Sequence, residues 1–283
     1  MSLDLIKTAT YLSIHLTVGF TVAYLMTGSV ALAGGMAAER LFQHASGNTA
    51  YTAQLGFRAG VPELQINSNL QGMALSLPAP LNKTAEATLP LRLDTSVLSV
   101  VGGHARSDRL ALQLGSSLAP VASLQYEREL GAAEPRVARG VIAIGMTGDA
   151  AATPLPAEGV AAHVQLDQLD ADAWERTFSS AAGVEVRTAA TAAATVLPRV
   201  GPAVGDANAS LGYLPSTLAL RAERLTVRGR HFHRVVLGGS RDGPQWQANV
   251  DADELNGYVS VRQSGPGTAG NVYARLARLQ LEP

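Results

Sequence analysis

Alternation of apolar and polar residues restricts the fold of this chain more than any other feature of its sequence. Between residues 51 and 58, Tyr51, Ala53, Leu55 and Phe57 alternate with polar residues or glycine. Consecutive side chains of a β-strand point to opposite faces, so this period of two predicts a half-buried antiparallel strand. The same pattern recurs in four further sets: Leu64 and Ile66; Leu110, Leu112 and Leu114; Val160, Ala162, Val164 and Leu166; and Trp246, Ala248 and Val250.

Helical segments are few in this part of the chain. Residues 171–180 predict one short helix, with Asp170 as its N-cap and Trp174 and Phe178 four positions apart on one face. The Ala-rich residues 188–197 fit either a helix or a loop. An amphipathic sheet must cover its apolar face. With so few helices, the sheet must fold on itself as a β-sandwich, pack against another domain, or hold an apolar ligand.

The N-terminus has a different character. Residues 8–38 contain no Asp, Glu, Lys or Arg, and about 20 mostly apolar residues suffice for a helix to cross a bilayer. We therefore expect a transmembrane anchor in residues 1–45 and a β-rich domain in residues 46–283. Two alternatives stay open: a cleaved signal peptide, with 31–33 as its small-residue site, or a helical hairpin that turns at residues 27–29.

Composition excludes several classes of protein. The net charge of -1 argues against nucleic-acid binding, which requires a basic surface. The chain has no cysteine, so it has no disulfide framework and no thiol nucleophile. Charged residues make up 16% of the chain, well below the roughly 25% of typical soluble domains. This shortage of charge fits a protein that works at a membrane or with an apolar ligand.

Three local patterns suggest chemistry but have simpler interpretations. Residues 265–270 match the dinucleotide pattern G-x-G-x-x-G, yet a strand-like alternation follows them where a helix is required, which predicts a hairpin loop. His231 and His233 share a strand face without an evident third metal ligand. The acidic groups near residues 167–172 and 251–254 are typical of a helix start and of a turn. We therefore expect no enzyme activity, no metal and no cofactor.

Two resemblances to known families add to this interpretation. Residues 4–44, including Tyr11, His15 and Glu39, resemble short bacterial inner-membrane hairpins of unknown function. Residues 47–283 resemble the C-terminal region of the YhdP family of AsmA-like bacterial envelope proteins. The most specific string is residues 68–81; others in matching order include residues 139–143, 169–174, 246–253, 255–258 and 272–279.

The YhdP resemblance implies a fold and a function. The fold would be mainly β: a long curled antiparallel sheet with an apolar inner groove, one or two short helices, and an N-terminal transmembrane helix or hairpin. The protein would sit in the inner membrane with its β-rich domain in the periplasm, and it would take part in phospholipid transport between the two membranes of a Gram-negative cell. The residues expected to line the lipid groove are Tyr51, Leu55, Phe57, Leu64, Ile66, Leu110, Leu112, Leu114, Trp246 and Val250.

Family members are longer, so we expect a truncated relative, a fusion or a partial gene model, acting with other envelope proteins or with a second copy. One rival hypothesis is a structural envelope protein whose sheet binds a protein partner without lipid. Another is an enzyme on a β-sandwich, which would need polar groups that converge in one pocket.

Overall fold

The computed structural model describes residues 44–117, 119–131, 135–146, 153–180, 212–242, 245–262 and 271–280. These residues form strands and one helix. In chain order the elements are β1 (Ala45–Gly47), β2 (Tyr51–Arg58), β3 (Val61–Ser68), β4 (Met73–Leu75), β5 (Leu91–Val101), β6 (His104–Gly115), β7 (Pro120–Glu129), β8 (Arg136–Ile144), β9 (Gly159–Asp170), α4 (Ala171–Ser180), β10 (Thr217–Val227), β11 (Arg230–Asp242), β12 (Gln245–Asp251), β13 (Leu255–Arg262) and β14 (Asn271–Leu279).

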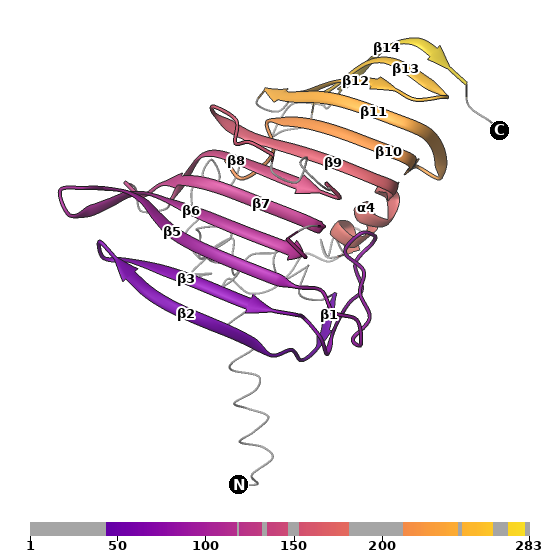
Figure 1. Cartoon of the computed structure of the whole chain (residues 1–283). Helices are drawn as coiled ribbons and strands as arrows, with labels where there is room; N and C mark the ends of the chain where they lie inside the picture. The colour runs from indigo at the N-terminus through magenta and orange to yellow at the C-terminus, as the bar shows by residue number, and fades with distance from the viewer. Residues whose placement is uncertain are drawn as a thin grey trace, which may run out of the picture.

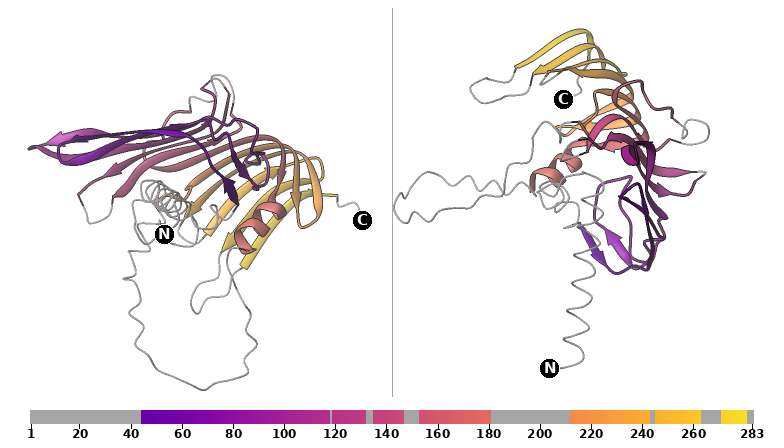
Figure 2. Two further views of the ribbon diagram at one scale, coloured as in Figure 1. Left: turned by 90° about the horizontal axis from the view of Figure 1, so that it is seen from below. Right: turned by 90° about the vertical axis from the view of Figure 1, so that its left-hand side faces the viewer.

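Twelve strands form a single large sheet (Figures 1 and 2). Its order is β14-β13-β12-β11-β10-β9-β8-β7-β6-β5-β3-β2, so most strands lie beside their neighbours in sequence. The short strands β1 and β4 pair separately in an antiparallel ribbon. The mainly β prediction is therefore confirmed, and so are the strands predicted from alternation, which are β2, β3, β6, β9 and β12.

Three details of the predicted fold are wrong. The sheet is open and not curled: its edge strands β2 and β14 lie at opposite ends (Figure 1). It is also not antiparallel throughout, because β9 pairs in parallel with both β8 and β10. Parallel neighbours need a long crossover connection, and residues 145–158 and 171–216 provide the two connections. Finally, β2 is exposed along its whole length rather than half-buried, because it is an edge strand with a single neighbour.

The helix α4 begins as its sequence predicts. The backbone N–H of Ala173 donates to Asp170 Oδ1 at 2.8 Å, which is the hydrogen bond of an N-cap residue. The Asp172 carboxylate accepts from the backbone N–H groups of Arg228 and Gly229 at 2.6 and 2.7 Å. On the other side, Trp174 Nε1 donates to the carbonyl of Ala79 at 3.2 Å. The helix therefore links the β10–β11 turn to the segment that follows β4.

Replacing the cap should weaken this link. We expect Asp170→Ala to lower the free energy of unfolding by about 1 kcal/mol, because one N-terminal backbone donor loses its acceptor. Urea denaturation followed by circular dichroism measures the change. Asp167→Ala is the matched control, since Asp167 is exposed on β9 and caps no helix. Equal effects of the two substitutions would contradict this role.

The predicted transmembrane segment, residues 8–38, and the second Ala-rich stretch, residues 188–197, lie outside the described residues. Within the described part of the chain, no helix is both long enough and apolar enough to cross a bilayer.

Candidate functional site

One face of the large sheet is apolar across its full width. Residues that pair in register on neighbouring strands point to the same face. Starting from Ala53 on β2, the register passes through one residue on each of the twelve strands, and none of these residues is polar. This apolar row consists of Ala53, Ile66, Leu93, Leu112, Leu124, Ile142, Ala162, Leu218, Gly239, Ala248, Val259 and Ala274.

The opposite face is different in kind. The adjacent register row, which begins at Gln54 on β2, is mostly polar and belongs to the other face of the sheet. It consists of Gln54, Gln65, Asp94, Ala111, Gln125, Val141, Ala161, Thr217, Ser240, Gln247, Ser260 and Tyr273. We call the side of the apolar row the apolar face and the other side the polar face. Among the described strands, only β1 and β4 lie outside the large sheet, and they form a two-stranded ribbon of their own.

All ten residues predicted to line a groove lie on the apolar face, but they fall into four environments. Ile66 and Leu110 are buried in one packed cluster with Leu93, Tyr126 and Val160, and Leu64 and Leu112 pack against it. Leu114 is half-buried at the end of β6. Tyr51, Leu55 and Phe57 are exposed on the edge strand β2. Trp246 and Val250 lie apart from these, near the other end of the sheet.

Around Trp246 and Val250 the apolar face contains a pocket of about 350 Å³. Its lining comes from β10, β11, β12, β13 and the β12–β13 turn, and every lining residue is apolar. These residues are Leu225, Val227, Phe232, Val235, Leu237, Trp246, Ala248, Val250, Ala252, Leu255, Val259 and Val261. A pocket of this composition offers surface contact without hydrogen bonds, which suits a hydrocarbon chain.

The pocket depends on an irregularity that alternation does not predict. On β9, β10 and β11 two consecutive residues are exposed: Asp167 and Gln168, Glu223 and Arg224, His233 and Arg234. One residue of each pair lies in the same register row: Arg224 on β10 pairs with Gln168 on β9 and with His233 on β11. After this point the alternation resumes in the opposite phase. Leu169, Leu225 and Phe232 therefore pack with the same cluster as Leu220 and Val235.

A charged pair interrupts the apolar face on β6 and β7. The Arg128 guanidinium donates to both carboxylate oxygens of Asp108, at 2.9 and 2.5 Å, and each side chain is only 5% exposed. Burial alone would lower the pKa of Arg128, but the bonds to Asp108 outweigh it, so the pKa is raised. Arg128 Nη1 also donates to the hydroxyl of Tyr213 at 3.5 Å.

Tyr126 completes this polar cluster. Its ring meets that of Tyr213 edge-on, with centroids 5.2 Å apart, and its hydroxyl donates to the Tyr213 carbonyl at 3.1 Å. On β8, Gly140 leaves space for the ring, because a Cβ at Gly140 would overlap it. These contacts hold the segment before β10 against the apolar face.

Burial, with a smaller contribution from Tyr213, raises the pKa of Tyr126 from 10 to about 12. We therefore expect a phenol that ionises about two pH units later than an ordinary tyrosine. The contribution of this phenol to the free energy of unfolding is fully present below pH 10 and is lost as the pH rises through 12. Ultraviolet titration of phenolate measures this, and Tyr126→Phe should remove the late step. A late step that persists in Tyr126→Phe would contradict this assignment.

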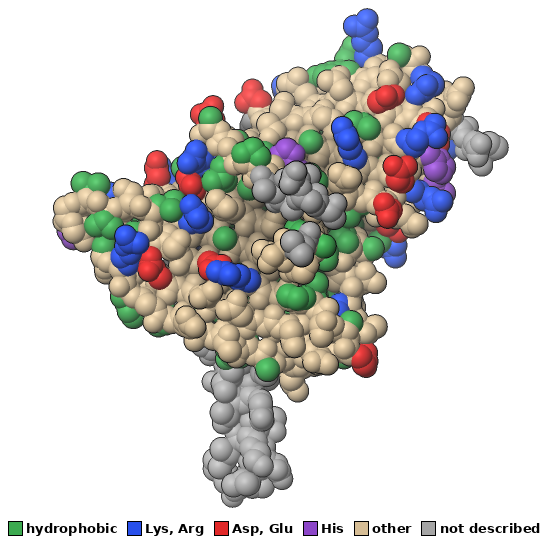
Figure 3. Space-filling view, viewed as in Figure 1, with side chains coloured by type: hydrophobic (Ala, Val, Ile, Leu, Met, Phe, Trp, Pro, Cys, Tyr) green, Lys and Arg blue, Asp and Glu red, His purple; other side chains and the backbone are tan. Residues whose placement is uncertain are grey.

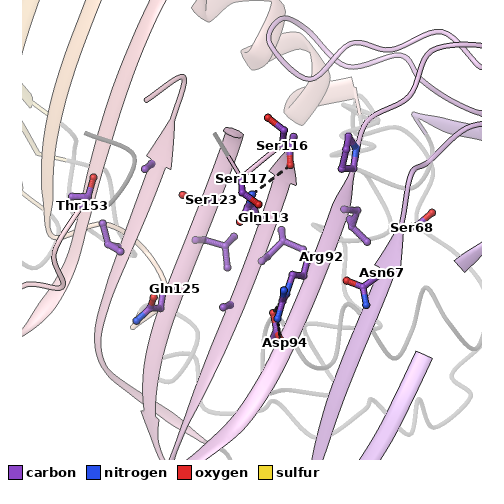
Figure 4. Close-up of a pocket in the computed structure, with 18 residues that line it drawn as sticks. Asn67, Ser68, Arg92, Asp94, Gln113, Ser116, Ser117, Ser123, Gln125 and Thr153 are labelled. Carbon is purple, nitrogen blue, oxygen red and sulfur yellow. Dashed lines mark hydrogen bonds and ion pairs between the residues drawn. The ribbon is translucent and has the colours of Figure 1, made fainter. Parts of the chain in front are cut away.

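A larger pocket, of about 690 Å³, lies on the polar face (Figure 4). Asn67, Arg92, Gln113 and Ser123 form a register row across β3, β5, β6 and β7 and are among its lining residues. Arg92 is paired with Asp94 through hydrogen bonds of 2.8 and 3.1 Å. Because burying these groups against hydrocarbon would cost free energy, size alone does not make this pocket the candidate lipid site.

His231 and His233, the two histidines considered as metal ligands, bond to neighbouring side chains of the protein. His233 bonds through Nδ1 to Glu254 at 2.6 Å, and Thr226 bonds to His231 Nδ1 at 3.0 Å. In the described part of the chain, no three His, Asp or Glu side chains are arranged to hold a metal. Residues 265–270 lie outside the described residues, but β14 follows them as a strand antiparallel to β13, as predicted.

Comparison with known proteins identifies the family. The family model described as YhdP protein matches residues 2–283, essentially the whole chain. The chain belongs to the YhdP family. No curated protein and no solved structure was found to match it.

Membership in the YhdP family confirms the resemblance seen in residues 47–283, and the match also includes the N-terminal residues. It is consistent with an envelope protein that associates with membranes and phospholipid. Sequence reasoning did not find the Asp108–Arg128 pair or the pocket residues from β10, β11 and β13. The alternation of Leu218, Leu220 and Ala222 was an available signal for β10.

Proposed function

We propose that this protein is a membrane-anchored envelope protein that holds phospholipid acyl chains on its apolar face and takes part in lipid transport between the inner and outer membranes. The anchor would be residues 8–38, and the β-rich domain would lie in the periplasm. The proposed role requires no catalytic residue, metal or cofactor, since the ligand is held by apolar contact. A reporter fused after Pro283 that is active only in the cytoplasm would contradict the periplasmic placement.

The observation that carries the proposal is the apolar row, which crosses all twelve strands without a polar side chain. A sheet normally covers such a face with a second layer. Each methylene removed from water contributes about 0.8 kcal/mol, so an acyl chain of about 16 carbons could gain on the order of 10 kcal/mol. Membership in the YhdP family supports the same assignment.

The direct test is chemical analysis of the purified protein. The full chain is extracted from membranes in mild detergent, and lipids that remain bound after washing are identified by mass spectrometry. We expect phospholipid in stoichiometric amount and in excess over an unrelated single-span membrane protein treated in parallel. Equal amounts in the two preparations would count against the proposal.

A second candidate function is supported by the edge strand β2. All of its residues are exposed, and Arg58 is its single charged residue. Edge strands usually carry charges or other features that block pairing with a further strand. A structural envelope protein could use this edge to bind a protein partner by strand addition. Crosslinking at β2 that traps one stoichiometric protein, from a preparation without bound lipid, would favour this function over lipid transport.

A further inference from the structure

Two hairpin turns lie next to each other at one end of the sheet. β3 runs antiparallel to both β2 and β5, so the β2–β3 turn and the β5–β6 turn are at the same end. Figure 1 and the left panel of Figure 2 show the β5–β6 hairpin projecting outward there. We call residues 57–61 and 98–104 together the hairpin tip.

The hairpin tip exposes large apolar side chains. The exposed fractions are 73% for Phe57, 40% for Leu98, 42% for Val100 and 56% for Val101. Figure 3 shows hydrophobic side chains at this projecting end of the molecule. Clustered exposed apolar residues of this kind mark sites of contact with a membrane or another molecule.

Two arginines flank the apolar residues of the tip. From residue 95 to residue 105 the chain has no Asp, Glu, Lys or Arg, and Arg58 and Arg106 are exposed on either side of the apolar residues. Of the acidic groups nearby, Asp108 forms an ion pair with Arg128, and Glu63 Oε1 accepts from the Val97 backbone N–H, a neutral donor, at 2.7 Å. Glu129 is exposed on β7 and is the register partner of Ser107 on β6 and of Arg136 on β8. Arg58 and Arg106 thus lie beside the apolar tip residues, where they can contact negatively charged groups of a surface.

The hairpin also has the backbone freedom to project. The ladder between β3 and β5 ends at the pair Gln65 and Asp94. Beyond it, the backbone N–H of Leu64 donates to the Thr95 side chain, at Oγ1, at 2.8 Å and not to a backbone carbonyl of β5. The turn residues Gly102 and Gly103 have positive φ of 60° and 80°, which glycine adopts without strain. From Leu98 onward β5 is therefore paired with β6 alone.

We propose that the hairpin tip inserts its apolar side chains into the headgroup boundary of an anionic phospholipid bilayer, with Arg58 and Arg106 contacting the lipid phosphates. This inference rests on the proposed function, because Phe57 belongs to both the tip and the apolar face. The tip would thus bring the end of the apolar face to the bilayer surface, where acyl chains enter or leave. Partial insertion of apolar side chains beside basic residues is a known mode of surface binding.

The absence of cysteine allows a specific label. The full chain carrying Val101→Cys is labelled with an environment-sensitive fluorophore and reconstituted in vesicles of phosphatidylethanolamine and phosphatidylglycerol. The vesicles that hold the protein contain spin-labelled lipid as a quencher. A second population of vesicles without protein, which also contains this lipid, is then added. We expect a blue shift and strong quenching at Val101→Cys. The matched control is Val236→Cys, which is 47% exposed on the polar face, and it should show neither.

Charge is tested separately. We expect Arg58→Gln and Arg106→Gln each to weaken the apparent binding of the labelled tip by about fivefold in vesicles with phosphatidylglycerol, and much less with phosphatidylcholine in its place. Equal quenching at Val101→Cys and Val236→Cys, or none at Val101→Cys, would overturn the proposal. Quenching of Trp246 by lipids with brominated acyl chains reports binding on the apolar face independently. Quenching of Trp246 without quenching at Val101→Cys would overturn the tip proposal alone. Absence of Trp246 quenching would count against the proposed function.

Discussion

Replacing Arg128 with methionine is expected to lower the free energy of unfolding by about 3–5 kcal/mol. The substitution keeps the apolar volume but leaves the Asp108 carboxylate buried in the apolar face without its bidentate partner. Urea denaturation of the β-rich domain within the detergent-solubilised full chain measures the loss. Since the folded domain has only a modest margin of stability, a change of this size should be visible as a large shift of the midpoint.

Two further variants isolate the cause. The double substitution Asp108→Leu with Arg128→Met removes both charges, and we expect it to recover most of the lost stability. Arg92→Met breaks the ion pair between Arg92 and Asp94, whose side chains are 57% and 34% exposed, respectively. We expect it to lower the free energy of unfolding by less than about 1 kcal/mol. If Arg128→Met cost no more than Arg92→Met, the buried pair would not have the importance assigned to it.

The second large effect concerns the apolar pocket. Val250→Asp is expected to reduce phospholipid binding at least about tenfold, because a carboxylate in a hydrocarbon-lined pocket must be desolvated when the acyl chain enters. Bound lipid per protein, measured by mass spectrometry after identical washing, provides the comparison.

Asn249→Asp is the matched control for this substitution. It introduces the same side chain at the neighbouring position of β12, on the polar face, and should leave lipid binding unchanged. Thermal unfolding of both variants shows whether each remains folded. Lipid binding by a folded Val250→Asp protein at the unchanged level would mean that the pocket is not where acyl chains lie.

Local sequence patterns predicted the faces of the strands well, and there is a physical reason. Side-chain direction in a strand follows from the backbone itself. The alternation around Leu55, Ile66, Leu112 and Trp246 was therefore enough to place all ten predicted residues on one face. The Asp170 cap likewise fixed the start of α4, because the cap acts within one turn of the helix.

Properties that depend on distant parts of the chain were not accessible in this way. Alternation cannot show that β2 is an edge strand, because the residues from Tyr51 to Phe57 alternate in the same way as those of strands that are buried in the sheet. It also cannot show that β9 has two parallel neighbours, since that depends on how the crossover connections run. Asp108 and Arg128 sit on different strands, and only their register makes them a buried pair.

The central claim is that acyl chains lie on the apolar face, and Trp246 can test it directly. The chain has two tryptophans, of which Trp246 lines the apolar pocket while Trp174 lies on α4. Trp174→Phe leaves Trp246 as the sole fluorophore, and Trp246→Phe provides the converse control. Phospholipids with brominated acyl chains should quench the fluorescence of Trp174→Phe and leave that of Trp246→Phe largely unchanged. Equal quenching of the two variants, or no quenching of Trp246, would contradict the account.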